Sequence, residues 1–570
     1  MRYISMIILL SVTTVVIGQT FVSGAVSGVW DSTGSPFYVT DSVCVPSGDS
    51  LRIGPGVEVI FQGHYKFCVD SNAVLKAIGT AADSILFTAE DTVLTDSTGG
   101  HHGIRFYKTV NCSISYCRIE WGHAFDPMYI DVDNFSGGGV FCDSSRITIT
   151  NCLFIHNYIG GFMCGGGGAI CSYRSVINII QNSFIENDGF DSASVIISYS
   201  EGVIKRNYFL RNTGAIFCNR SDPLIESNVM LNNSSGWPAG AIACRGSSPK
   251  IINNIIGWNT GDYVGGIACW SGSPLIINNT IYGNYGYIKA GAIYCRGVAK
   301  PTIINNAIST NTGVLADEIY IQGHISYICT VFIAYCDIDT SKCVVNNDTL
   351  DFCIFGPGNV NYDPMFVDTA AGDFRLQDGS PCIDAGAESV YIALWDTVIY
   401  APDIDIDSNP RPVGLDWDIG AYESPYTAMS RIDYDAGWNL ISNPSELPFD
   451  TDITGFSYYG YETPTGSYFD AESLYLAKGY WLLGTSAGTT FISGGEPAYT
   501  DTLYRGWNLI GSIKYPIPRN RIATEPPGLG LTPPYGWDRA ASSYFTADSL
   551  FPGKGYWFLS SGNGRITVGP

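Results

Sequence analysis

The sequence predicts an all-β protein whose largest part is a parallel β-solenoid. The chain has 570 residues, of which 65 are Gly and 36 are Tyr, and only 15% are charged. Short runs rich in β-branched residues alternate with Gly, Asn and Ser-Pro turns, and one such pattern recurs nine times between residues 100 and 345. Each copy has room for about three short strands, as expected for one coil of a solenoid.

Nine anchor positions define the repeat, at spacings of 21 to 35 residues. Ile stands three residues before every anchor, and an apolar residue stands two residues after it. Seven copies also have Asn five residues after the anchor. The anchors are Cys117, Cys152, Asn182, Asn207, Asn228, Asn254, Asn279, Asn306 and Cys336. Because equivalent positions stack from coil to coil, we expect the Ile column to be interior and the Asn columns to hydrogen-bond along the axis at turns.

Other repeat folds fit this pattern poorly. Helical repeats need apolar stripes at i, i+3 and i+4 over ten or more residues, and none is present. Propeller blades are longer, at about 40 residues, and the leucine-rich consensus is missing. The repeat therefore favours a parallel β-solenoid.

Many of the 17 cysteines form a further column about ten residues before the anchors. Its members are Cys142, Cys171, Cys218, Cys244, Cys269 and Cys295, with Phe106 and Ile197 substituting in two copies. This column alternates with Ala243, Ala268 and Tyr294, which are predicted to face outward, so we expect reduced thiols that pack inside the solenoid. The better disulfide candidates lie outside the column, at Cys329, Cys336, Cys343 and Cys353.

Export is predicted from the N-terminus. Residues 1–25 combine Arg2, an apolar run from Ile4 to Ile17, and small residues near Ala25, as in a secretory signal peptide. The alternative is an N-terminal membrane anchor, but the run is short for a span and no positive flank follows it. The rest of the chain has no comparable apolar stretch. We expect a mature protein without a transmembrane segment, secreted or at the cell surface.

Segments on either side of the repeat complete the predicted organisation. We assign residues 26–100 to an N-terminal capping segment, 101–345 to regular coils and 346–424 to a closing segment. The repeat resembles the right-handed parallel β-helix family, the pectin-lyase-like superfamily, in its bacterial branch; residues 28–90 and 362–423 resemble the first and last parts of such proteins. The resemblance implies a right-handed solenoid and leaves the function open, because this scaffold carries many chemistries.

Two tandem β-modules are predicted at residues 427–497 and 498–570. Gly437–Ile441 recurs as Gly506–Ile510, and Lys478–Trp481 recurs as Lys554–Trp557. They resemble the paired Gly-Trp-Asn-Leu-Ile modules at the ends of some prokaryotic surface proteins. The recurring residues Trp438, Trp481, Trp507 and Trp557 are predicted to form the module cores, with a glycan-stacking platform as the alternative. The better candidates for surface ligand binding lie outside the repeated motifs, at Tyr458, Tyr459, Tyr461 and Trp537.

No catalytic residue is predicted. The paired carboxylates of glycosidases and the sequence motifs of polygalacturonase-like relatives are missing. One insertion carries His123, Asp126, Asp131 and Asp133, which could supply a base and a Ca²⁺ site, although a solvated acidic loop explains it as well. His101 and His102 are interpreted as a loop. No cofactor is expected, with Ca²⁺ as the one possible exception.

The predicted function follows from these features. A net charge of −23 argues against a nucleic-acid partner. Our leading hypothesis is an exported, non-catalytic solenoid protein that binds a polysaccharide or cell-envelope polymer, with C-terminal modules for attachment or binding. One alternative is a polysaccharide-active enzyme (lyase, hydrolase or epimerase) on the solenoid face. The other is a purely structural envelope component.

Overall fold

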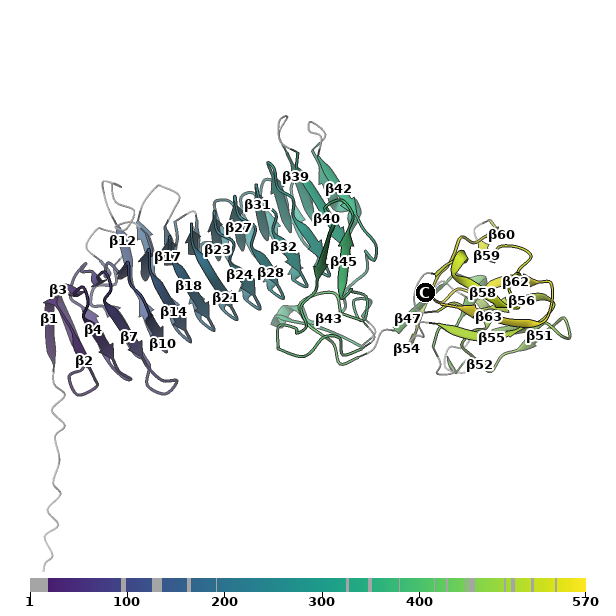
Figure 1. Cartoon of the computed structure of the whole chain (residues 1–570), viewed down its shortest axis with the longest axis horizontal. Coiled ribbons are helices and arrows are strands. Elements are labelled where there is room, and N and C mark those ends of the chain that lie inside the picture. The colour runs from purple at the N-terminus through teal and green to yellow at the C-terminus, as the bar shows by residue number, and fades with distance from the viewer. Residues whose placement is uncertain are drawn as a thin grey trace, which may run out of the picture. The chain divides into compact units, whose positions relative to one another are not determined.

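The computed structural model shows an all-β architecture (Figure 1). It describes residues 19–569, with gaps at 94–98, 126–135, 161–165, 191, 324–327, 347–350, 379, 415, 427–428, 446–448, 451–456, 486–487, 494–497, 514–516 and 539–540. The described residues hold strands and short 3-10 turns but no α-helix, the turns being η1 (Thr340–Lys342), η2 (Thr369–Ala371) and η4 (Arg519–Arg521). The chain divides into two compact units, Met1–Asn361 and Tyr362–Pro570.

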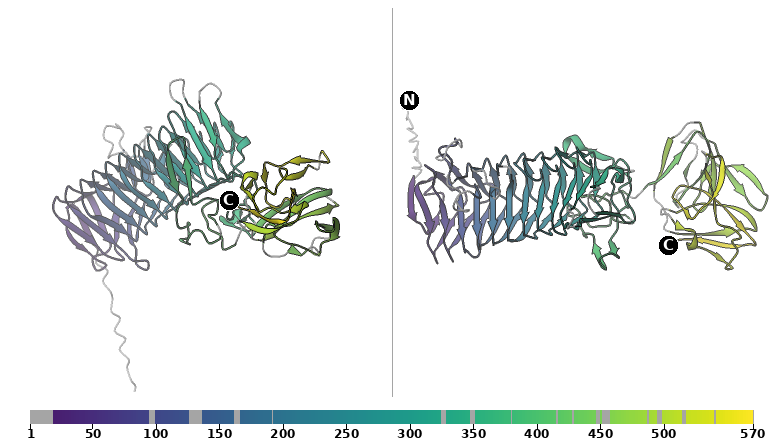
Figure 2. Two further views of the ribbon diagram at one scale, coloured as in Figure 1. Left: turned by 45° about the vertical axis from the view of Figure 1, so that its right-hand side comes forward. Right: turned by 90° about the horizontal axis from the view of Figure 1, so that it is seen from above.

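The first unit is a solenoid built from three columns of parallel strands, stacked coil on coil (Figure 2). The first column is β2 (Gly28–Trp30), β4 (Ser50–Ile53), β7 (Val74–Ile78), β10 (Cys112–Ser115), β14 (Arg146–Thr150), β18 (Val176–Ile180), β21 (Glu201–Lys205), β24 (Leu224–Glu226), β28 (Lys250–Ile252), β32 (Leu275–Ile277), β36 (Thr302–Ile304), β40 (Thr330–Ala334) and β42 (Phe352–Phe355). The second column is β5 (Glu58–Phe61), β8 (Ile85–Ala89), β11 (Cys117–Glu120), β15 (Leu153–Ile155), β19 (Ser183–Ile185), β22 (Tyr208–Leu210), β25 (Val229–Leu231), β29 (Ile255–Gly257), β33 (Thr280–Tyr282) and β37 (Ala307–Ser309).

The third column is β1 (Thr20–Ala25), β3 (Phe37–Val45), β6 (Phe67–Val69), β9 (Ile104–Tyr107), β13 (Val140–Asp143), β17 (Gly167–Tyr173), β20 (Ala193–Ser198), β23 (Ile216–Asn219), β27 (Ile242–Arg245), β31 (Ile267–Trp270), β35 (Ile293–Arg296), β39 (Ile319–Gln322) and β41 (Cys343–Val345). Short flanking strands are β12 (His123–Phe125), β16 (Tyr158–Gly160), β26 (Ser234–Ser235), β30 (Thr260–Gly261), β34 (Tyr285–Gly286) and β38 (Thr312–Gly313). The long strand β3 pairs with both β5 and β6, and so joins the second and third columns at the first coils.

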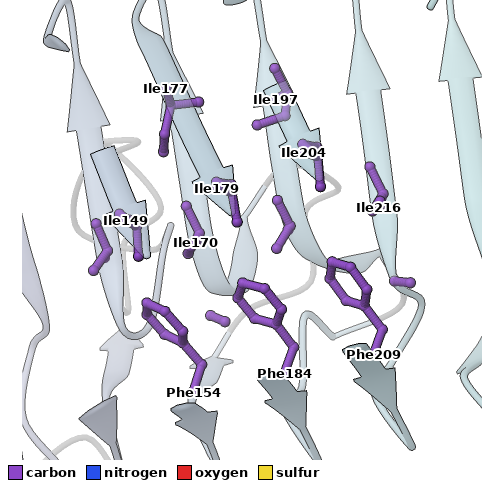
Figure 3. Packing of buried hydrophobic residues seen from close by; sticks show 14 of the residues in the cluster. Ile149, Phe154, Ile170, Ile177, Ile179, Phe184, Ile197, Ile204, Phe209 and Ile216 are labelled. Atoms are coloured by element: carbon purple, nitrogen blue, oxygen red, sulfur yellow. The ribbon is translucent and has the colours of Figure 1, made fainter. Parts of the chain in front are cut away.

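The Ile column of the repeat is interior, as the sequence predicts. From Ile114 to Ile333 its members pair directly between neighbouring coils, and each is at most 1% exposed. Phenyl rings two residues after the anchors stack beside this column, with centroids of Phe154 and Phe184 5.0 Å apart and of Phe184 and Phe209 4.7 Å apart (Figure 3). Like side chains therefore stack on one another in the interior of the solenoid.

Two amide ladders run along the turns. In one, each Asn donates from Nδ2 to the Oδ1 of the Asn in the next coil at 2.9 to 3.0 Å, from Asn157 to Asn311. The other runs in the same way from Asn182 to Asn306. Cysteines replace Asn at the ends of the second ladder, where Cys152 and Cys336 accept backbone N–H groups through Sγ. The amides satisfy backbone groups that the turns would otherwise bury unpaired.

The cysteine column is buried as predicted, but Cys171 does not belong to it. Cys218, Cys244, Cys269 and Cys295 pair in register and are at most 2% exposed. Cys171, however, pairs with Phe141, while its neighbour Ser172 takes the column position beside Cys142. The reason is the spacing in the sequence: Ile170 pairs with Val140, and Cys171 follows Ile170 directly, whereas Cys142 stands two residues after Val140.

Residues that alternate with this column belong to a second hydrophobic cluster outside the main core. Ala243, Ala268 and Tyr294 point away from the solenoid interior as predicted, yet each is at most 3% exposed. Val264 and Ala290, from the turns that return to the third column, cover them. This face of the solenoid is thus a second buried layer.

The four disulfide candidates are free thiols in the structure. Cys329 and Cys336 are buried, and Cys343 and Cys353 are half-buried. None of the described cysteines is bridged. Cys336 instead serves the second amide ladder, where its Sγ is 3.4 Å from the Asn306 backbone nitrogen. The expectation of disulfides at these four positions is corrected accordingly.

The first coil begins inside the predicted signal peptide. Strand β1 occupies Thr20–Ala25 and pairs with β3, and the Thr20 hydroxyl donates to the Gly34 carbonyl at 2.7 Å. Residues 1–18 lie outside the described part of the chain. The predicted leader and the first strand therefore overlap by six residues.

The second unit starts with the closing segment and continues into the two modules. The closing segment holds β43 (Phe366–Asp368), β44 (Asp373–Leu376), β45 (Ser389–Ile392) and β46 (Thr397–Tyr400). The first module holds β47 (Met429–Tyr434), β48 (Gly437–Ser442), β49 (Phe449–Asp450), β50 (Ser457–Glu462), β51 (Ser467–Asp470), β52 (Ser473–Leu474), β53 (Gly479–Gly484) and β54 (Gly488–Ser493). The second holds β55 (Tyr499–Leu503), β56 (Gly506–Ile510), β57 (Ile517–Pro518), β58 (Ile522–Glu525), β59 (Tyr535–Asp538), β60 (Ser543–Thr546), β61 (Ser549–Leu550), β62 (Tyr556–Ser560) and β63 (Gly564–Val568).

The main sheets of the two modules have the same strand order. In the first module it is β48-β53-β50-β51, and in the second it is β56-β62-β59-β60, both antiparallel. One face of each sheet packs on its own module core. The other face carries the aromatic residues from which the candidate site is built.

Candidate functional site: paired aromatic pockets

The Gly-Trp-Asn-Leu-Ile motif places its Trp on the aromatic face of each sheet. In β48, the buried Asn439 amide donates to the carbonyls of Asp435 and Gly437 at 2.8 and 2.9 Å, which fixes the preceding turn. Successive strand residues alternate between faces, so Trp438 and Leu440 share the face opposite Asn439 and Ile441. Trp438 is consequently 45% exposed.

The second module repeats this arrangement. Asn508 donates to the Tyr504 carbonyl at 2.7 Å and accepts the Tyr504 N–H at 3.0 Å. Its neighbour Trp507 is 41% exposed. Local turn chemistry thus aims one Trp outward in each module.

The modules pack against each other with approximate twofold symmetry. Ile441 bridges Lys554, and the equivalent residues of the opposite modules, Ile510 and Lys478, bridge in the same way. The backbone hydrogen bond from Ser442 N–H to the Gly553 carbonyl, 2.9 Å, is matched by Gly511 N–H to Ala477, also 2.9 Å. Reciprocal contacts of this kind define an isologous, twofold interface. Leu440, Leu509, Trp481 and Trp557 form its buried centre.

Two pockets open on either side of this interface. Pocket A, about 420 Å³, is lined by Trp438, Tyr459, Tyr468, Trp481, Trp537 and Tyr544. Pocket B, about 440 Å³, is lined by Tyr461, Tyr468, Trp507, Tyr535, Tyr544 and Trp557. Each takes two Trp and one Tyr from one module and one aromatic residue from the other, and both share Tyr468 and Tyr544.

Ring contacts in the two pockets correspond pair by pair. Across the interface, the ring centroids of Trp481 and Trp537 are 5.4 Å apart at 77°, and those of Trp557 and Tyr461 are 4.9 Å apart, also at 77°. Within the modules, Trp438 lies 6.2 Å from Trp481, and Trp507 lies 6.4 Å from Trp557. These edge-to-face contacts hold the rings rigid and leave flat faces toward the pockets.

Polar groups in the pockets are few and specific. Every described residue that lines pocket A or pocket B is Trp or Tyr, so the walls carry no formal charge at neutral pH. The indole N–H groups of Trp537 in pocket A and Trp557 in pocket B are buried without an acceptor among the described residues. Both nitrogens are closed to solvent, so a ligand in the pockets would instead meet the phenol groups of Tyr468 and Tyr544, which are exposed and line both pockets.

Three of the four predicted ligand-binding residues meet in these pockets. Tyr459 lies in pocket A, Tyr461 in pocket B, and Trp537 in pocket A. Tyr458 is 3% exposed in the first module core, which corrects the expectation that it lies on the surface. The reason is strand alternation, since Tyr458 faces away from Tyr459 and Tyr461 in β50.

The prediction for the recurring Trp residues is half right. Trp481 and Trp557 are buried at 8% exposure, as core residues should be. Trp438 and Trp507 are exposed and line the pockets, which contradicts the core prediction for them. Burial of the Asn side chain that follows each of them explains the outward orientation.

Three pocket residues were not singled out from the sequence: Tyr468, Tyr535 and Tyr544. Tyr468 and Tyr544 occupy equivalent positions in β51 and β60, whose four residues are all exposed. The repeated Ser-Tyr-Phe motif carried the signal, because an exposed aromatic residue kept at the same position in both modules indicates binding more than packing. Tyr535 corresponds to Tyr459 and pairs with Trp557 across the sheet.

A second polar cluster lies in the solenoid near the 120–135 insertion. His102 and His64 are 2.8 Å apart between Nδ1 and Nε2, and the His64 and His123 rings are 5.6 Å apart between centroids. His101 accepts the Gly103 N–H through Nδ1 at 3.0 Å, so its Nε2 carries the proton that bonds to the Glu120 carbonyl. The predicted loop at His101 and His102 is therefore buried. Arg105, fully buried, bonds to the Gly137 carbonyl.

Burial keeps these imidazoles neutral. It lowers the pKa of His64 to about 4 and that of His101 to about 3, and it lowers the pKa of His102 further. A general base works best with a pKa near the operating pH, so these groups are poorly matched to proton abstraction near neutrality. The cluster supports the enzyme alternative less well than its composition suggests.

The predicted calcium ligands are not described. Asp126, Asp131 and Asp133 lie in the 126–135 gap, so the Ca²⁺ prediction stays a prediction. Across the described ranges, no group of three or more His, Cys, Asp or Glu side chains is arranged to hold a metal ion. Nor do the described residues include a helix with the length and apolar character needed to cross a bilayer.

Comparison with known proteins supports the fold. Residues 78–273 match the family described as "Right handed beta helix region". Similar solved structures include the periplasmic alginate epimerase AlgG, with 11% identity, 58% of this chain and 78% of that chain covered, and a TM-score of 0.23. Another is PfbA, a surface adhesin of Streptococcus pneumoniae, with 13% identity, coverage of 56% and 83%, and a TM-score of 0.26. These structural likenesses are too slight to carry a functional conclusion, and no curated protein matches the chain. The solenoid is accordingly a right-handed parallel β-helix over the matched residues.

Proposed function

We propose that this protein is an exported, non-catalytic glycan-binding protein whose C-terminal modules bind uncharged sugar chains in pockets A and B. The observation that carries the proposal is the combination, in each pocket, of an all-aromatic lining with the phenol groups of the exposed Tyr468 and Tyr544. A pyranose ring presents both complements, an apolar C–H face and hydroxyl oxygens. The solenoid then serves as a scaffold.

The energetics favour this class of ligand. Trp and Tyr supply large contact areas and lose little conformational entropy on binding, because each has only two side-chain torsions. Rings already locked by edge-to-face contacts, such as Trp481 against Trp537, need no further ordering. Hydrogen bonds to the phenol groups of Tyr468 and Tyr544 would fix the orientation of the sugar.

Other occupants fit less well. A hydrocarbon chain would cover the rings but leave the phenol groups of Tyr468 and Tyr544 without a hydrogen-bonding partner. A quaternary ammonium ion suits an aromatic cage, but it offers no hydrogen-bonding group to these phenols. A polyuronate would approach walls without a cation on a protein of net charge −23.

Titration of the full chain with short oligosaccharides tests the proposal. We expect saturable binding of cellohexaose or chitohexaose, weaker binding of an acidic oligogalacturonide, and no competition by tetramethylammonium. Trp438→Ala and Trp507→Ala should each weaken binding at their own pocket about tenfold or more. Phe469→Ala is the control, because Phe469 is 49% exposed on the opposite face of β51.

Each contrary result has a defined meaning. Displacement by tetramethylammonium would identify a cation cage, and unchanged affinity in both Trp variants would move the site elsewhere. Product release from the same oligosaccharides would favour the enzyme alternative. In that case His102→Gln should abolish release if the histidine cluster is responsible.

A further inference from the structure

We infer that pockets A and B hold two glycan segments that run in opposite directions, so that one molecule bridges two polymer chains. This inference rests on the proposed function. It concerns the arrangement of the two sites, which neither the fold nor the aromatic composition alone determines.

The direction of binding follows from the symmetry of the module pair. The reciprocal bridges Ile441–Lys554 and Ile510–Lys478 relate the modules by an approximate twofold axis. A glycan chain has a reducing and a non-reducing end, so when the chain lies perpendicular to this axis, a pocket that prefers one direction imposes the reverse direction on its symmetry mate. A single straight chain that crosses both pockets can satisfy only one of them in the preferred orientation.

Contacts along the interface show that the symmetry extends to the pocket walls. The Trp481–Trp537 contact of pocket A and the Trp557–Tyr461 contact of pocket B have the same interplanar angle of 77°. Strand β48 corresponds to β56, and β50 corresponds to β59. The contact between β50 and β56 is therefore matched by the contact between β59 and β48.

The pockets are contiguous, which places the two segments side by side. Tyr468 and Tyr544 line both pockets, so one pair of phenol rings forms a common wall. Tyr468 is 55% exposed and Tyr544 is 51% exposed, so this wall is accessible to a ligand. The arrangement fits neighbouring chains of a polymer bundle better than two distant strands.

One substitution breaks the symmetry and makes the pockets unequal. Position 461 is Tyr in pocket B, whereas the equivalent position 537 in pocket A is Trp. Pocket A therefore has the larger aromatic surface and the stronger stacking partner, so we expect it to bind the tighter segment. Occupation of pocket A would then hold a polymer while pocket B captures its neighbour at high effective concentration.

The test uses the full chain, two hexasaccharides and their soluble polymers: cellohexaose with hydroxyethyl cellulose, and chitohexaose with glycol chitin. Calorimetric titration should give two hexasaccharides per protein chain, and light scattering should rise when the polymer is added. Trp438→Ala, unique to pocket A, and Trp507→Ala, unique to pocket B, should each retain one hexasaccharide and lose the rise in scattering. An equimolar mixture of the two variants should also fail to cross-link.

Every other outcome overturns the inference. A stoichiometry of one hexasaccharide in the unmodified protein means that one ligand crosses both pockets. Cross-linking by a single-pocket variant means that bridging comes from another surface or from self-association, which sedimentation without polymer would show. Failure of both hexasaccharides to bind refutes the proposed function itself, whereas binding without cross-linking refutes only the bridge.

Discussion

Asn311 donates a hydrogen bond from Nδ2 to Glu318 Oε2 at 3.0 Å, and with this contact a ladder of seven amides ends on a carboxyl group. Glu318 is 2% exposed, and burial raises its pKa to about 8. The negative charges of Asp317 and Asp339 also raise the pKa of Glu318, whereas the positive charge of Lys342 lowers it. The folded protein therefore holds a proton here that the unfolded chain releases above about pH 4.5.

This shift predicts a pH-dependent stability effect of Glu318→Gln. Because the folded pKa is raised, the contribution of Glu318 to stability is fully present below pH 4.5 and is lost as the pH rises to about 8. Gln keeps the acceptor for Asn311 and does not titrate. The variant should match the unmodified protein near pH 4.5 and exceed it increasingly up to pH 8, by at most about 1.4 kcal/mol per pH unit. Denaturant unfolding across this range measures the difference; a constant difference would contradict the assignment.

The interior of the ladder should be sensitive to loss of a single amide. Asn259 accepts from Asn233 and donates to Asn284, at 2.9 and 3.0 Å, and is fully buried. Asn259→Ala removes the acceptor of the Asn233 backbone N–H and the side-chain donor to the Met230 carbonyl, which should lower the free energy of unfolding by about 1–3 kcal/mol for each group left unpaired. The exposed Asn361 supplies the control, and Asn361→Ala should change stability by less than about 0.5 kcal/mol. Equal changes in the free energy of unfolding in the two variants would show that the amide ladder does not stabilise the fold.

Core thiols should be unreactive in the folded protein. Cys244 is 2% exposed, and its contact with Cys218 together with burial raises its pKa well above the ordinary value. Cys244→Ser should destabilise the protein more than Cys244→Ala, because the serine hydroxyl prefers water whereas the methyl group does not. Thiol titration should show slow reaction until denaturant is added. Rapid modification of Cys244 under native conditions would be inconsistent with the packing described.

Processing of the N-terminus should preserve the first strand. Thr20–Ala25 pairs with β3, so removal of all 25 predicted leader residues would strip an edge that covers part of the core. We expect cleavage before Thr20, which still removes the apolar run from Ile4 to Ile17. Mass spectrometry of the exported chain gives the first residue directly. A mature protein that starts at Val26 would show that β1 is dispensable.

The repeat made most of the solenoid predictable. Ile and Asn recur at fixed distances from each anchor, and stacking of like residues turns that regularity directly into structure. Cys171 shows where this reasoning failed, because alignment on cysteine ignored the apolar residue two positions earlier. Ile216 and Ile267 precede their cysteines by two residues, whereas Ile170 is adjacent to Cys171, so Ser172 takes the column position instead.

The pockets were predictable only in part. Strand alternation in β50 separates Tyr458 from Tyr459 and Tyr461, so this error was avoidable from the sequence. The twofold packing of the modules was not, because it depends on how two complete surfaces fit together. Trp537 and Trp481 belong to different modules, so they come into contact only through that packing. Both then line pocket A.

The central claim is that aromatic pockets A and B bind sugar. A crystal structure of the full chain with chitohexaose or cellohexaose tests it most directly. The account predicts pyranose rings stacked against Trp438 in pocket A and Trp507 in pocket B, with sugar hydroxyl groups hydrogen-bonded to the phenol groups of Tyr468 and Tyr544. Empty pockets beside an oligosaccharide bound on the solenoid would contradict it.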